Sequence, residues 1–196
     1  MIEKNLKKRI FTSLVLLILT IFFFYFKFAI VYTLIVLGTL SIIEFTNLVN
    51  KITNKIIYKF FSNIFFIIYI FLFSFFCFYL SSIFQFKILL FLILFTCIAS
   101  DIGGYVVGKI FKGPKLTKIS PKKTKSGSLG SMLFSGVFFS IGIFYLTNTI
   151  NIKIVFIGLL TSIICQIGDL FFSFLKRKSN VKDTGNFFPG HGGVLD

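Results

Sequence analysis

The feature that most constrains this chain is a succession of six apolar runs, each about as long as a bilayer is thick. A helix needs about 20 apolar residues to cross a hydrocarbon core of about 30 Å. The runs lie at roughly 10–26, 28–49, 60–84, 88–111, 129–147 and 154–175. Only Lys27 separates the first two, and one helix through both would be about 60 Å long. A tight hairpin near Lys27 is therefore expected.

Composition supports lipid as the main solvent of the chain. Of its 196 residues, 56% are hydrophobic and only 14% are charged. A soluble domain of this size needs more polar cover for its surface. We therefore predict an all-α fold, a polytopic integral membrane helical bundle of about six transmembrane helices with basic cytoplasmic loops. It should form one membrane-embedded unit over 1–196, with N-terminal spans at about 1–95 and a catalytic region at about 96–196.

The net charge of +15 is distributed as in a membrane protein and does not indicate a nucleic-acid partner. The cations lie in short runs between apolar segments and form no folded basic domain. With the N-terminus in the cytoplasm, 18 of the 21 Lys and Arg residues fall on the cytoplasmic side. The positive-inside rule requires such a bias. We therefore expect the cell (inner) membrane, with the N-terminus and the catalytic loops in the cytoplasm.

Three of the six acidic residues, Glu44, Asp101 and Asp169, lie inside apolar runs. Ionisable residues within a membrane are costly and usually face a protein interior or a watery cavity, where they mark function. Asp101 and Asp169 lie near the cytoplasmic ends of their runs, and we interpret them as functional, with interhelical hydrogen bonding as the alternative. For Glu44, five or six residues inside its run, a structural role is the preferred interpretation.

Two polar loops suggest what these carboxylates serve. Residues 120–130 mix lysines, hydroxyls and glycines, a set that suits an oligophosphate, because Lys supplies charge and Gly lets backbone N–H groups approach an anion. The alternative is an ordinary basic loop that contacts anionic lipid headgroups. Residues 173–196 combine cations, two carboxylates and His191 between glycines, where the histidine could equally hold the loop's shape.

The segment from Ser173 to Asp196 resembles the signature of the phosphatidate cytidylyltransferase (CDP-diacylglycerol synthase) family. It reads Ser, then Lys-Arg, then Lys-Asp, then Pro-Gly-His-Gly-Gly, and ends in Asp. Upstream, Ser-Asp-Ile-Gly-Gly-Tyr from Ser100, Ser-Pro-Lys-Lys-Thr from Ser120 and Gln-Ile-Gly-Asp-Leu from Gln166 resemble family segments in the same order. The resemblance covers roughly residues 95–196.

The resemblance implies transfer of CMP from CTP to phosphatidate, with Mg²⁺ or another divalent cation as cofactor and membrane lipid as surroundings. It makes Asp169 and Asp196 candidate metal ligands. The candidate catalytic residues are these two carboxylates together with Lys182 and Asp183. With the motifs above, it assigns substrate contacts to Asp101, Ser120, Lys122, Lys123, Thr124, Ser173, Lys176, Arg177 and His191. A homo-oligomer is left open, and no nucleic-acid partner is expected.

One departure and three alternatives accompany this interpretation. The family signature normally continues past Asp196 with an Arg, a further Asp and another hydrophobic segment, so a fragment of a longer enzyme is expected. The nearest alternative is a related polyprenol or isoprenoid-lipid CTP-transferase or kinase. From another class, a small ion transporter could use Asp101 and Asp169 along an ion path. A non-catalytic assembly protein is the third.

Overall fold

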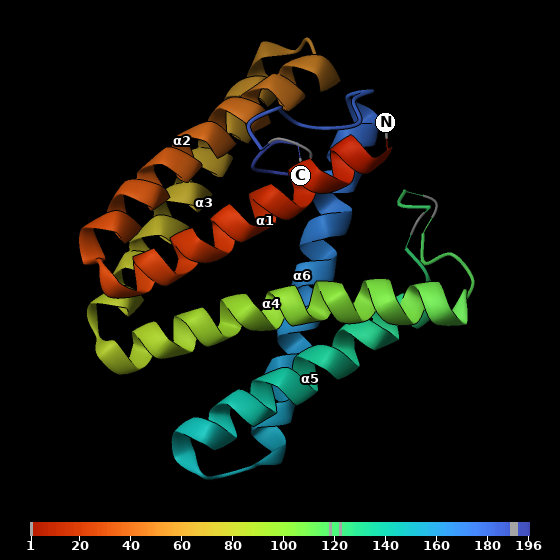
Figure 1. The fold of residues 1–196 in the computed structure, drawn as a ribbon. Coiled ribbons are helices and arrows are strands. Elements are labelled where there is room, and N and C mark those ends of the chain that lie inside the picture. Colours follow the sequence, from red (N-terminus) through yellow and green to blue (C-terminus); the bar gives the residue numbers. More distant parts are fainter. Residues whose placement is uncertain (1, 118, 122, 189–191) are drawn as a thin grey trace. The chain divides into compact units, whose positions relative to one another are not determined.

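A computed structural model describes residues 2–117, 119–121, 123–188 and 192–196, and its regular secondary structure in these ranges is helical (Figure 1). The all-α prediction is confirmed. The six helices are α1 (Ile2–Tyr25), α2 (Lys27–Ile52), α3 (Ile56–Ser82), α4 (Phe84–Phe111), α5 (Lys125–Thr147) and α6 (Ile152–Lys178).

Five of these helices, α2 to α6, are long and apolar enough to cross a membrane. In α1 the apolar stretch found among the described residues is Leu14–Tyr25, which is shorter than a span, so the predicted first crossing stays a prediction. Large apolar side chains such as Phe28 and Ile56 are almost fully exposed on these helices. In a bilayer they contact acyl chains, and the chain is an integral membrane protein.

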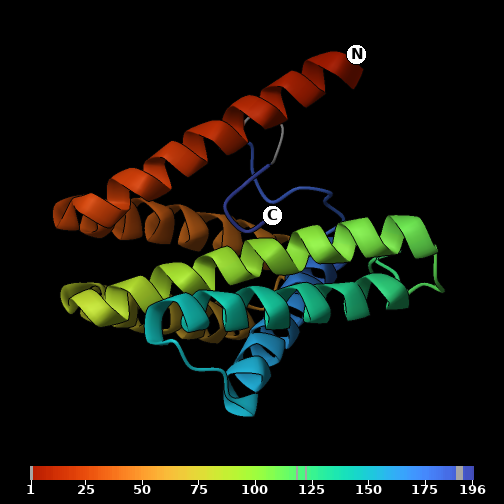
Figure 2. The same ribbon diagram turned by 60° about the horizontal axis from the view of Figure 1, so that its bottom comes forward.

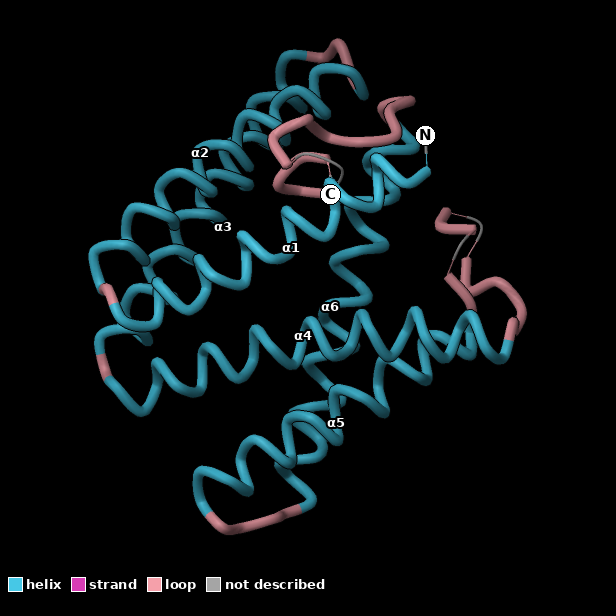
Figure 3. Tube along the Cα trace, viewed as in Figure 1, coloured by secondary structure: helices cyan, strands magenta, loops and turns pink. Residues whose placement is uncertain are grey.

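Short extended linkers separate the first helices, as Figure 3 shows. Phe26 leaves the helical conformation with φ −110° and ψ 108°, which ends α1 and starts α2 at Lys27. Helix α1 contacts α2, and α2 packs against α3. The predicted hairpin near Lys27 is therefore confirmed.

By its internal contacts the chain divides into two compact units. The terminal unit comprises Met1–Lys87 and Leu175–Asp196, and the central unit comprises Ile88–Phe174. In the terminal unit Phe45 of α2 stacks on Phe66 of α3, with ring centroids 3.9 Å apart. The predicted boundary between N-terminal spans and a catalytic region concerns function, and it stays a prediction.

Small residues let the helices of the central unit approach closely (Figure 2). A Cβ on Gly103 of α4 would lie 2.5 Å from the Phe134 side chain of α5. Between α4 and α6, the hydroxyls of Ser100 and Ser162 are 2.7 Å apart. Close backbone approach of this kind is how helices associate where lipid offers no hydrophobic drive between them.

The stripe of small residues at Ser100, Gly104 and Gly108 faces these neighbours, as its spacing of four suggests. A Cβ on Gly104 would meet Ser131, and a Cβ on Gly108 would meet Thr124. The polar ends of α4, α5 and α6 are thereby held together in one unit.

Candidate functional site

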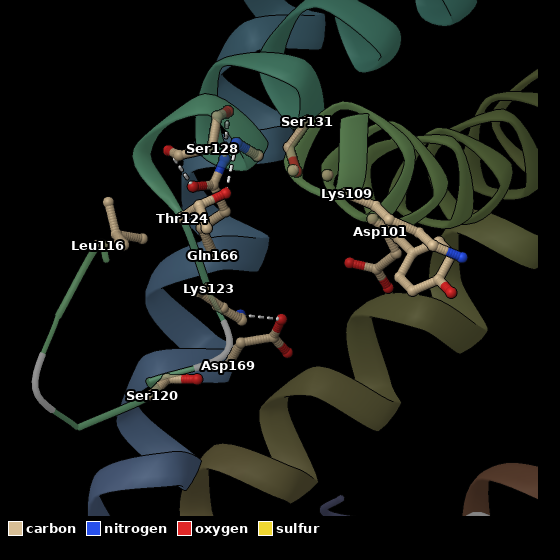
Figure 4. A pocket seen from close by; sticks show the side chains of 14 residues that line it. Asp101, Lys109, Leu116, Ser120, Lys123, Thr124, Ser128, Ser131, Gln166 and Asp169 are labelled. Atoms are coloured by element: carbon tan, nitrogen blue, oxygen red, sulfur yellow. Dashed lines mark hydrogen bonds and ion pairs between the residues drawn. The ribbon is translucent and has the colours of Figure 1, made fainter. Parts of the chain in front are cut away.

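A cavity of about 400 Å³ opens in the central unit between α4, the loop that follows it, α5 and α6 (Figure 4). Five of the predicted site residues line it, namely Asp101, Ser120, Lys123, Thr124 and Asp169. Residues up to 68 positions apart in the sequence therefore line the same cavity. A volume of this size lies within the range of small-molecule sites.

The charged groups that line this cavity are two lysines, Lys109 and Lys123, and two carboxylates, Asp101 and Asp169. Lys123 Nζ donates to Asp169 Oδ2 at 2.6 Å, and the Asp169 side chain is 53% exposed. The negative charges of Asp101 and Asp169 repel each other, and the charge of Lys123 offsets part of this repulsion. Because an exposed ion pair contributes at most about 1 kcal/mol, a ligand can replace it at little cost.

The amide of Gln166 and the hydroxyl of Ser128 form a hydrogen-bonded part of the cavity wall. Ser128 Oγ donates to Gln166 Oε1 at 2.5 Å, and Gln166 Nε2 donates to the Ser128 carbonyl and to Ser162 Oγ. Gln166 and Asp169 are three positions apart and therefore lie on one face of α6. Ser128 lies within the segment 120–130 that the sequence analysis names, but one serine among several hydroxyls carries no signal that singles it out.

The first turn of α5 lines the same cavity. Thr124 caps the helix, with its Oγ1 accepting from Gly127 N at 3.0 Å. Thr124, Gly127 and Ser128 all line the cavity, so the N-terminal end of a helix faces it. Such an end carries partial positive charge and favours anions. Cations, hydroxyls and a helix N-terminus together suit a phosphate-bearing ligand.

The C-terminal segment has a different kind of carboxylate, in the terminal unit. Asp196 accepts from Lys176 Nζ at 2.8 Å and from the backbone N–H groups of Thr184 and Gly193, each at 2.7 Å. Its side chain is only 7% exposed, although the residue as a whole is exposed. Burial raises the pKa of Asp196, but these hydrogen bonds outweigh it and hold the pKa below its ordinary value.

Glu44 of α2 is held by the same segment. Its carboxylate accepts from Thr184 Oγ1 at 2.8 Å and from the backbone N–H groups of Val194 and Leu195, each at 2.9 Å. The residue is 7% exposed. These contacts agree with the structural role that its depth in the apolar run suggested.

The remaining predicted residues are spread over both units. Ser173 is half-buried on α6 and lies outside the lining of the cavity. Arg177, Lys182 and Asp183 are exposed. Lys122 and His191 lie outside the described residues, so their predicted roles stay predictions.

The chemistry of the cavity suits a hard divalent cation. Within the described ranges no group of three or more His, Cys, Asp and Glu side chains could hold a metal. Mg²⁺ commonly uses only one or two carboxylates and completes its shell with substrate phosphates and water. Asp101 and Asp169 offer such oxygens. The oxygens of Asp196 already accept N–H groups, so a metal there would have to replace at least one of them.

The fold and the cavity define a polytopic helical membrane protein with a polar pocket that suits phosphate groups. Residues 1–196 match the family model described as "Cytidylyltransferase family". The chain is a member of this family of nucleotidyltransferases, and the resemblance seen in its motifs is confirmed.

Several curated proteins named phosphatidate cytidylyltransferase are similar to this chain. The one from Rickettsia felis is 43% identical over 117 residues, which cover 54% of this chain and 51% of that protein. The Synechocystis sp. protein is 46% identical over 107 residues, 52% of this chain and 36% of its own length. One from Helicobacter pylori is 37% identical over 105 residues, 53% and 39% respectively. The chain spans about half or less of the length of these relatives.

Proposed function

We propose that this protein is a phosphatidate cytidylyltransferase, which transfers CMP from CTP to phosphatidate and releases pyrophosphate. The observation that carries the proposal is the cavity in which Lys123, Asp169 and Asp101 meet the N-terminal turn of α5. Family membership supports the reaction class, and the names of the relatives support the substrates. Membership also favours this reading over the ion transporter.

The reaction asks the protein mainly for positioning and for control of charge. A phosphate oxygen of phosphatidate attacks the α-phosphorus of CTP, and the bond from that phosphorus to the β-phosphate's bridging oxygen breaks. Both reactants are anions, so they repel each other. Lys123 and the first turn of α5 are placed to bind the triphosphate and lower this repulsion. Thr124 and Ser128 add hydrogen-bonding groups at the same turn.

A bound Mg²⁺ would supply charge neutralisation at the phosphates. Asp169, with Asp101 beside it, is the proposed carboxylate group for it in the cavity. The further assignment of Asp196 as a metal ligand is carried over from the family signature. The distribution of Lys and Arg supports an orientation in which the N-terminus and the polar loops face the cytoplasm.

The test is formation of lipid-linked CMP by the full chain in proteoliposomes. CTP labelled at the α-phosphate is supplied with Mg²⁺ and either phosphatidate or a polyprenyl phosphate. We expect label in CDP-diacylglycerol and release of pyrophosphate. Asp101→Asn should lower the rate, because it removes one carboxylate from the cavity but keeps its shape. Gln85→Ala, an exposed site near the start of α4, should not.

Each outcome separates the candidate functions. Label transferred to polyprenyl phosphate and not to phosphatidate would replace the proposed substrate. Phosphorylation of a lipid without transfer of CMP would indicate a kinase. A folded protein that binds no CTP and forms no product would refute the proposal.

A further inference from the structure

Glu44 is a buried carboxylate in a helix that is otherwise apolar enough to span a membrane. All three groups that donate to it come from the C-terminal segment, 140 to 151 positions further along the chain. The motif analysis assigned it no role in the reaction. Burying a carboxylate is costly unless hydrogen bonds compensate for the lost water. Three donors from one segment provide that compensation.

The segment is shaped closely around this carboxylate. A Cβ on Gly185 would lie 2.6 Å from Glu44 Oε1, and one on Gly193 would also contact the Glu44 oxygens. The hydroxyl of Thr184 and the N–H groups of Val194 and Leu195 face this carboxylate. Its charge is balanced by N–H and O–H dipoles of the segment. A side chain at position 185 or 193 would displace the Glu44 carboxylate.

Thr184 connects Glu44 to Asp196. Its hydroxyl donates to Glu44 Oε2 at 2.8 Å, and its backbone N–H donates to Asp196 Oδ2 at 2.7 Å. On the other side of the segment, Gly193 N donates to Asp196 and the next residue's N–H donates to Glu44. The two carboxylates therefore accept hydrogen bonds from neighbouring groups of one segment. If the segment moved relative to Glu44, the N–H groups that donate to Asp196 would move with it.

We propose that Glu44 is a positioning residue that fixes Thr184 and residues 193–196 and thereby sets the orientation of Asp196 for CMP transfer. The inference rests on the proposed function for its catalytic consequence, and on the contacts alone for the anchoring. It extends the functional machinery into α2, a helix that carries none of the family motifs. Glu44 acts through Thr184 and the segment, and it touches no substrate in this role.

The test compares Glu44→Gln and Glu44→Ala with wild type in lipid nanodiscs. Gln has the same shape, but its NH₂ group must face at least one N–H donor. Amide exchange of Val194 and Leu195 should therefore quicken by about 10- to 100-fold in Glu44→Gln, because a hydrogen bond to a charged group is lost. It should quicken more in Glu44→Ala. Turnover at saturating substrates should fall, while CTP binding measured by equilibrium dialysis stays within about twofold.

Thr46→Val is the matched control on the same helix. Its hydroxyl donates to the Ile42 carbonyl of α2 itself, so neither exchange nor turnover should change. Unchanged exchange of Val194 and Leu195 in Glu44→Ala would overturn the anchoring. Faster exchange with full turnover would overturn the positioning role. Loss of CTP binding in parallel with turnover would show general unfolding instead. If wild type forms no CDP-diacylglycerol, the proposed function fails, and the exchange data still decide the anchoring.

Discussion

The central unit and the terminal unit use carboxylates in opposite ways. Asp169 in the central unit is half exposed, and among the described residues it pairs with the long side chain of Lys123. In the terminal unit, Glu44 as a whole residue and the side chain of Asp196 are each 7% exposed. Backbone N–H groups account for most of their hydrogen-bond partners. The first arrangement leaves oxygen lone pairs free for a ligand. The second uses them to hold the chain.

This difference distinguishes a carboxylate that can bind a ligand from carboxylates that hold the chain, in a protein with only six acidic residues. A carboxylate acts on a ligand only if its partner can be displaced cheaply, and an exposed ion pair meets that condition. A carboxylate saturated by backbone donors resists displacement, since each buried donor would be left unsatisfied. Four substitutions or conditions test this contrast, in order of decreasing expected effect.

The largest effect is expected for Asp169→Asn. It removes one of the two negative charges from the cavity, so CMP transfer should fall by about 10²- to 10³-fold, as for loss of a group that stabilises charge in a transition state. Thermal stability should barely change, because the Lys123 pair is exposed. Thr161→Val on the same helix, whose hydroxyl bonds to its own helix, is the control. Activity close to wild type would remove Asp169 from the site and break the comparison.

The next test compares two glycines, Gly103 in a close helix contact and Gly168 in open space. Gly103→Ala places a methyl group against Phe134 and the Gly130 carbonyl, and should destabilise by about 1–3 kcal/mol. Gly168→Ala meets nothing within 4 Å and should be neutral or stabilising by about 0.5–1 kcal/mol, because alanine favours helix. Thermal unfolding in detergent measures both. Equal effects of the two substitutions would contradict the close contact of α4 with α5.

A smaller effect is expected for Lys123→Met. The substitution keeps the apolar stem and removes the charge, so CTP affinity should fall by about tenfold, the loss of one charge-assisted contact. Lys125→Met, two positions away and outside the lining, should lose much less. Equilibrium dialysis with labelled CTP measures the difference. Equal losses would mean that the cavity attracts nucleotide only by its general positive charge.

The smallest effect is a pH dependence confined to the terminal unit. The pKa of Asp196 is held below its ordinary value, so its contribution is complete above about pH 3.9 and is lost as the pH falls through the folded value. Amide signals of Thr184 and Gly193 followed by NMR should report a looser segment only in this acidic range. Asp196→Asn should abolish the dependence. Loosening well above about pH 5 would assign it to another group.

Much of the fold follows from local properties of the sequence. The long apolar runs predict α2 to α6, because helix formation satisfies the backbone within the segment and hydropathy decides insertion. The break at Lys27 follows from length alone. The start of α5 at Lys125 lies four residues before the predicted run, because Thr124 caps a polar first turn that hydropathy does not detect.

The sequence alone determined the class of protein, the helical spans and the residue types of the cavity, since these depend on local composition and spacing, and its motifs indicated the family by resemblance. Only the tertiary structure decided that Lys123 pairs with Asp169, that Ser128 binds Gln166, and that Glu44 holds a segment 140 positions away. Side-chain hydrogen bonds act over about 3 Å, so their partners depend on how helices distant in sequence approach each other.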